Sequence, residues 1–137
     1  MGATTRTYES SIGRTETILL WTVQALLAAL FLFAGGMKLL VPSDQLQAGA
    51  PIHFPSAFIH FIGTCEVLGA LGLVLPRATR VLPELTPIAA AGLVIIMVGA
   101  VTVTLAGGMG VAAAILPFVV GVLAALVAWR RGTGSRP

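Results

Sequence analysis

Glu66 is the residue of this sequence that is best suited to chemistry, because it is a lone carboxyl group inside a long apolar stretch. An ionised carboxylate in hydrocarbon costs about 2.5–3.5 kcal/mol on insertion scales, so such a group must be protonated, paired or hydrated. One interpretation is a proton-transfer or ligand-binding site. The other, which we favour, is a polar contact between helices, because the helical neighbours Gly63, Gly69 and Ala70 are small enough to admit another helix.

Two polar residues of the first apolar stretch are candidate partners for Glu66. Gln24 is predicted to lie at nearly the same membrane depth as Glu66, whereas Lys38 is predicted to lie about 17 Å further out at about 1.5 Å per helical residue. We therefore expect Gln24 to be the direct partner of Glu66. For Lys38 we expect the ammonium group to extend to the outer headgroups.

The remaining reactive side chains support little chemistry. His53 and His60 lie too close along one helix to ligate opposite faces of a haem, and His60 is expected to contact Thr102 or the carbonyl of Ala113. The single cysteine, Cys65, forms no intrachain disulfide or CxxC pair. We find no metal-ligand cluster, phosphate loop or nucleophile triad, so we predict no catalytic residue and no metal site, and lean against an enzyme.

These residues are positioned by membrane-spanning helices. The chain of 137 residues is 57% hydrophobic and 9% charged, whereas soluble domains carry about 25% charged residues. Glu16 and Lys38 bracket 21 uncharged residues, enough to cross a bilayer. The 45 uncharged residues between Glu84 and Arg130 must fold back at the glycines of 107–110. The sequence predicts an all-α transmembrane four-helix bundle over 17–130, with spans at about 17–40, 55–75, 85–106 and 110–129.

The basic residues predict an orientation. Seven of the eight lysines and arginines fall on one side of four spans, and only Lys38 falls on the other. By the positive-inside rule, the tails 1–16 and 131–137 are predicted to be cytoplasmic, in a multi-pass protein of the cell membrane. The basic residues flank apolar spans instead of forming a phosphate-binding face, so we expect the lipid bilayer, and no nucleic acid, as the partner.

Three segments resemble the DoxX-like family of small integral membrane proteins. Segment 33–39 (FAGGMKL) looks like the "aG..KL" end of the family's first helix, segment 62–76 (IGTCEVLGALGLVLP) is similar to its second helix, and 97–100 (MVGA) matches its third. The resemblance implies four helices and places Lys38 and Glu66 among the recurrent polar positions. Many members carry a histidine where this chain reads VTVT at 101–104, so a role that requires this histidine does not transfer.

The resemblance also suggests the kind of function. Founding members are membrane subunits linked to thiosulfate:quinone oxidoreductase, and others are tied to quinone or oxidative-stress systems. We therefore predict a non-catalytic membrane subunit or scaffold of a redox system, with membrane or redox-complex subunits or further copies of itself as partners. The alternative is a binder of a quinone or lipid in a bundle cavity polarised by Glu66, with Gln24, Lys38 and His60 as further site residues. A proton-coupled transporter is the weaker alternative. No cofactor is evident from the residues, and quinone is the one that the resemblance suggests.

Overall fold

Four long helices and one short helix make up the described part of the chain. The computed structural model describes residues 2–133, with side chains from residue 13 onward. The long helices are α1 (Gly2–Leu40), α3 (Ser56–Thr79), α4 (Leu85–Ala106) and α5 (Val111–Thr133), and α2 (Ser43–Leu46) is a single turn. Residues Gly13–Leu40 of α1 and the whole of α3, α4 and α5 are long and apolar enough to cross a membrane. The predicted all-α transmembrane bundle is confirmed for the described part of the chain.

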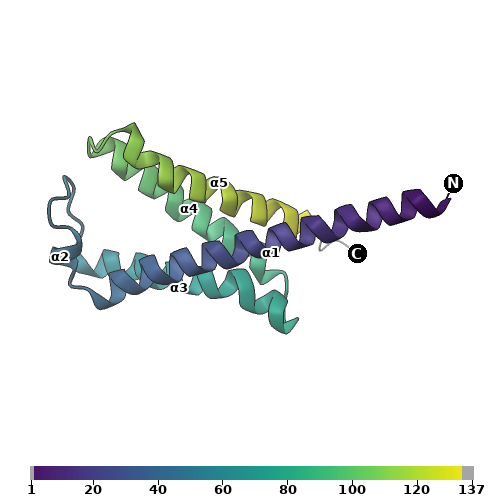
Figure 1. The fold of residues 1–137 in the computed structure, drawn as a ribbon. Coiled ribbons are helices and arrows are strands. Elements are labelled where there is room, and N and C mark those ends of the chain that lie inside the picture. Colours follow the sequence, from purple (N-terminus) through teal and green to yellow (C-terminus); the bar gives the residue numbers. More distant parts are fainter. Residues whose placement is uncertain (1, 134–137) are drawn as a thin grey trace.

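The bundle consists of two helix pairs. Helix α1 packs along α3 and helix α4 packs along α5, and the pairs meet mainly through α3 and α4 (Figure 1). The pairs diverge toward one end of the molecule, where α2 lies (Figure 1). The largest completely buried side chains include Phe31 of α1, Leu73 of α3, Leu93 of α4 and Val127 of α5. Every membrane helix therefore contributes a large side chain to one shared core.

Two glycines bring α1 and α3 into close contact. A Cβ atom on Gly35 would lie 2.7 Å from the carbonyl oxygen of Gly63, and one on Gly63 would lie 2.8 Å from the Cβ of Lys38. Neither position has room for a side chain, so the two backbones touch directly, as small residues allow between membrane helices. This contact fixes the register of α1 against α3 and places Lys38 level with Gly63.

The two ends of the bundle differ in structure and charge. We call the end with Arg14, Arg77, Arg80, Arg130 and Arg131 the basic end. The opposite loop end carries α2 and the turn between α4 and α5, in which Gly108 and Gly110 adopt φ values of 71° and 90° that glycine favours. A Cβ on Gly107 would lie 2.8 Å from the ring of Pro51. The segment after α2 therefore reaches across the loop end to the other helix pair.

Three helix bounds differ from the sequence prediction. Helix α1 begins at Gly2, within the predicted tail 1–16, and α5 continues to Thr133, into the predicted tail 131–137. Residues 134–137 of that tail lie outside the described part of the chain. The second span was predicted to end at Leu75, but α3 continues through Pro76 to Thr79. Proline removes one helical hydrogen bond without necessarily ending a membrane helix, because neighbouring helices can satisfy the freed groups.

Candidate functional site

A partly buried ion pair joins α1 to α3. The Nζ of Lys38 donates to both carboxylate oxygens of Glu66, at 2.8 Å to Oε2 and 3.0 Å to Oε1. The Glu66 side chain is 3% exposed and that of Lys38 is 28% exposed. An ionised carboxylate is tolerated in a membrane interior when a cation neutralises it, and Lys38 supplies that cation.

The predicted Gln24–Glu66 contact and the predicted extension of Lys38 toward the headgroups are both wrong. The depths were counted from helix ends that were assumed to be level, whereas α3 extends further and the Gly35–Gly63 contact sets the register. Lys38 consequently lies only three residues from the level of Glu66, about 4.5 Å along a helix, which its long side chain spans.

Gln24 instead joins three helices near the basic end. Its side chain is completely buried. Its Nε2 donates to the carbonyl oxygen of Leu73 on α3 at 2.5 Å, and its Oε1 accepts from Nε of Arg131 on α5 at 2.7 Å. Leu73 is seven residues, roughly 10 Å, along α3 from Glu66. Gln24 therefore belongs to a separate polar cluster at the basic end.

His60 does not reach the partners that were predicted for it. It is exposed, and its Nδ1 donates to the carbonyl oxygen of Ser56, one turn earlier in α3, at 2.7 Å. The hydroxyl of Thr102 donates to the carbonyl of Val98 in its own helix. The prediction that His60 contacts Thr102 or Ala113 is wrong, because a local backbone carbonyl satisfies the ring. His60 therefore takes no part in the contact between Lys38 and Glu66.

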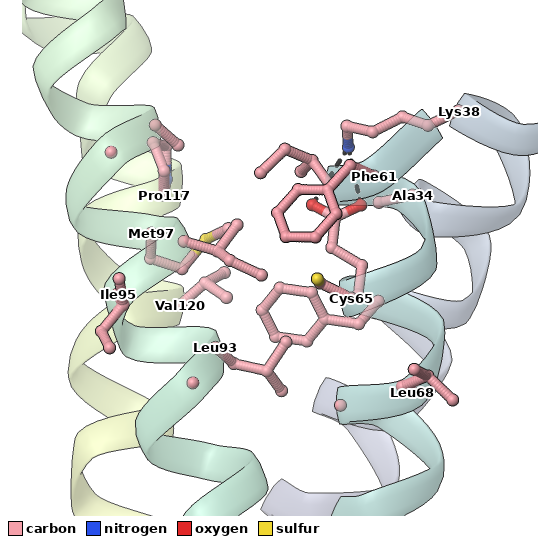
Figure 2. A pocket seen from close by; sticks show the side chains of 18 of the residues that line it. Ala34, Lys38, Phe61, Cys65, Leu68, Leu93, Ile95, Met97, Pro117 and Val120 are labelled. Atoms are coloured by element: carbon pink, nitrogen blue, oxygen red, sulfur yellow. Dashed lines mark hydrogen bonds and ion pairs between the residues drawn. The ribbon is translucent and has the colours of Figure 1, made fainter. Parts of the chain in front are cut away.

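The Lys38–Glu66 pair borders an apolar cavity of about 970 Å³. Its walls come from α1, α3, α4 and α5, so it lies between the two helix pairs. In Figure 2, Lys38 reaches over the α3 side, where Phe61 and Cys65 lie, and Leu93, Met97 and Val120 form the facing wall. Apart from the ion pair, the side chains of this cavity are almost all apolar, so polar chemistry is concentrated at one position.

The cavity opens on the lateral surface of the bundle. Phe61 and Leu68 of α3 and Ile88 and Ile95 of α4 line the cavity and are also exposed. In a membrane-spanning bundle these side chains face lipid. A hydrophobic molecule could therefore enter from the bilayer between α3 and α4 without crossing water.

Sequence reasoning missed the burial of Arg131. This residue was assigned to a tail, but it is 7% exposed and bonded to Gln24. A signal for this exists in the sequence, since Val120, Ala124, Val127 and Arg131 recur at intervals of three and four residues and all are buried. The cavity itself has no such signal, because it depends on how far the two helix pairs diverge.

The described part of the chain holds no group of three or more His, Cys, Asp or Glu side chains that could bind a metal ion. Cys65 lines the cavity as a free, half-buried thiol. The polar contacts that the structure does place in the cavity are thus those of Lys38 and Glu66.

The fold and the cavity define a multi-pass α-helical membrane protein with a lateral apolar cavity and, among the described residues, a partly buried ion pair at its wall. The model of the DoxX-like family matches residues 22–127. The chain therefore belongs to the DoxX-like family, as its motifs at Lys38 and Glu66 predicted. No curated protein and no solved structure matches the chain.

Proposed function

We propose that this protein binds a hydrophobic small molecule of the quinone or lipid class in the lateral cavity, with its polar group at Lys38 and Glu66. The single observation that carries the proposal is the apolar cavity of about 970 Å³ with a charged pair at its wall. Ligand sites are typically apolar cavities of about 300–1,000 Å³ with a few convergent polar groups. The volume and the lining both fit that description.

The ion pair favours an uncharged ligand with a hydrogen-bond acceptor. An ammonium group has three donors, and Lys38 directs its described hydrogen bonds to the two oxygens of Glu66, which leaves one donor for a ligand carbonyl or hydroxyl. Lys38 and Glu66 together carry no net charge, so a neutral ligand enters without leaving a charge unbalanced in an apolar site. These properties describe quinones and neutral lipids better than charged metabolites.

The cavity supports binding more directly than it supports catalysis. The described side-chain hydrogen bonds of Lys38 and Glu66 are to each other, so the pair is suited to orienting a ligand. The predicted role as a non-catalytic subunit of a redox complex remains compatible with such binding, since a subunit can hold a membrane-soluble molecule for its partner. Co-purification in mild detergent would test that role, and a chain that stays alone under all conditions would count against it.

We also propose that the basic end faces the cytoplasm. Among the side chains that the structure describes, five arginines and two glutamates, Glu16 and Glu84, lie at this end, and arginine-rich ends are retained on the cytoplasmic side. A reporter enzyme that works only in the cytoplasm should be active when it is fused after residue 137. Activity there of a reporter that works only outside the cell membrane would show the opposite orientation.

Filling the cavity provides the test of ligand binding. Gly92 and Gly99 line the cavity, and a Cβ atom on either would meet nothing within 4 Å. Gly92→Leu and Gly99→Leu should therefore place a side chain in the ligand's space without disturbing the protein. Gly36 also has open space around it but lies outside the cavity lining, so Gly36→Leu is the matched control.

The readout is the hydrophobic molecule that remains bound during purification in mild detergent, identified by native mass spectrometry. We expect an isoprenoid or lipid adduct on the wild type and on Gly36→Leu, and its loss on Gly92→Leu and Gly99→Leu. Glu66→Gln should retain less of the adduct because the ammonium group loses its anchor. Equal retention by all of these variants would show that the adduct binds elsewhere and that the proposed site is wrong.

A further inference from the structure

A second polar cluster lies at the basic end, away from the cavity, and Arg131 is at its centre. The Nε of Arg131 donates to Gln24, and its guanidinium lies over the ring of Trp21, 5.5 Å from the ring centroid. A guanidinium over an indole face is held by the attraction between a cation and the aromatic ring. These two contacts fix a positive charge at the end of α5.

Arg77, in the last turn of α3, adds a second positive charge beside the first. It is half-buried, and its Nε is enclosed without a hydrogen bond to any described residue. Arg77 lies one helical turn after Leu73, and Gln24 bonds both to the carbonyl of Leu73 and to Arg131, so Arg77 and Arg131 lie in the same region of the basic end. The described acids of this end do not compensate it, because Glu16 pairs with Arg130 and the exposed Glu84 forms no ion pair. A partly buried guanidinium such as that of Arg77, without a described acid beside it, calls for an anion.

Thr86 provides a further donor at the same end. It lies in the first turn of α4, is completely buried, and its hydroxyl has no hydrogen-bond partner in the described chain. Gly132, next to Arg131, packs against Pro87, next to Thr86, with 3.8 Å between a Cβ built on the glycine and the Cβ of the proline. The first turn of α4, which carries Thr86, therefore lies beside the last turn of α5, which carries Arg131.

We propose that the basic end binds a phosphate-type anion between the ends of α3 and α5, with Arg77 as its main ligand and Arg131 as a fixed second charge. Guanidinium groups suit phosphate oxygens because their planar donors can bind two oxygens at once. The last turns of membrane helices lie at the level of the lipid headgroups. The phosphate of an anionic lipid headgroup and free inorganic phosphate share this chemistry.

The test compares binding of short-chain phosphatidylglycerol, short-chain phosphatidylcholine and inorganic phosphate to the full chain in detergent, by native mass spectrometry. Phosphatidylcholine carries the same phosphate but no net charge, so the comparison shows whether binding requires a net negative charge on the headgroup. Arg77→Gln is the test variant. Arg80→Gln is the matched control, because it removes the same charge from an exposed position at the same end. Helicity and elution volume establish that each variant is folded.

We expect the wild type to prefer phosphatidylglycerol over phosphatidylcholine. Arg77→Gln should weaken phosphatidylglycerol binding about tenfold or more, the loss that corresponds to one charge-assisted hydrogen bond. Arg80→Gln should bind nearly as the wild type, and Arg77→Lys, which keeps the charge without the planar donors, should fall between the two. Competition by inorganic phosphate would identify a free anion as the ligand, and its failure to compete would identify the lipid headgroup.

Two results would overturn the proposal. If Arg80→Gln weakens binding as much as Arg77→Gln, the effect is diffuse surface charge and not a site. If the wild type does not distinguish phosphatidylglycerol from phosphatidylcholine and does not bind inorganic phosphate, there is no anion site at this end.

Discussion

Replacing Lys38 by methionine should destabilise the protein by about 3 kcal/mol. The substitution keeps the length and apolar stem of the side chain but leaves the carboxylate of Glu66, only 3% exposed, without its cation. Removing one partner of a buried pair costs about 3–5 kcal/mol, and insertion scales assign about 2.5–3.5 kcal/mol to a charge in the membrane interior. The lower part of this range applies because Lys38 lies two residues before the end of α1, close to the headgroups and water at the loop end.

The free energy of unfolding can be measured by titration with dodecyl sulfate in mixed micelles, within a double-mutant cycle. Glu66→Leu alone should cost less than Lys38→Met, because the flexible and partly exposed lysine can extend toward the headgroups. The double variant Lys38→Met/Glu66→Leu should lie within about 1 kcal/mol of the wild type, since apolar replacement of a buried pair is often nearly neutral. The coupling energy should therefore reach about 2 kcal/mol or more.

Additive single effects would refute this reasoning. If the double variant loses the sum of the two single losses to within about 0.5 kcal/mol, the two side chains behave as independent sites. The hydrogen bonds between Lys38 and Glu66 would then contribute nothing to stability, and the ion pair could not serve as the fixed polar group of the cavity.

Two further predictions concern the contacts between helices. Gln24→Leu should destabilise the protein by about 2–4 kcal/mol, because it leaves the carbonyl of Leu73 and the Nε of Arg131 without their described partner inside the bundle. The same dodecyl sulfate titration measures this loss of stability, and a loss below about 0.5 kcal/mol would contradict the prediction. Gly35→Ala should cost about 1–3 kcal/mol, because its Cβ would meet the backbone of α3. Gly36→Ala, which has open space, should instead be neutral or stabilising by up to about 1 kcal/mol, and equal effects at the two glycines would argue against the close contact.

The membrane helices could be predicted from the sequence because they depend on local composition. Uncharged runs between Glu16 and Lys38, and between Glu84 and Arg130, limit the spans, and the glycines of 107–110 mark the turn that divides the longer run. The short motifs around Lys38 and Glu66 were sufficient to predict the family, which the match to residues 22–127 confirms. These signals require no knowledge of how one helix lies against another.

The partners of the polar residues depend on register, and register is a property of pairs of helices. Counting depth from presumed ends placed Gln24 beside Glu66, whereas the contact between Gly35 and Gly63 brings Lys38 there instead. Helix α3 also continues through Pro76 to Thr79, so Glu66 lies further from the end of its helix than the predicted depth assumed. Depth arithmetic fails for such bundles, because an error of one helical turn, about 5.4 Å, is enough to exchange one polar partner for another.

The arrangement in two pairs also bears on how the protein is made. Each pair joins consecutive long helices, α1 with α3 across residues 41–55 and α4 with α5 across residues 107–110. Each pair can form soon after its second helix has been synthesised, because few residues separate the partners. The contact between the pairs is complete only after α5 has been synthesised, because α5 also packs against α1 and lines the cavity. A molecule bound there would hold the two halves together, so its supply during biogenesis would determine how much mature protein accumulates.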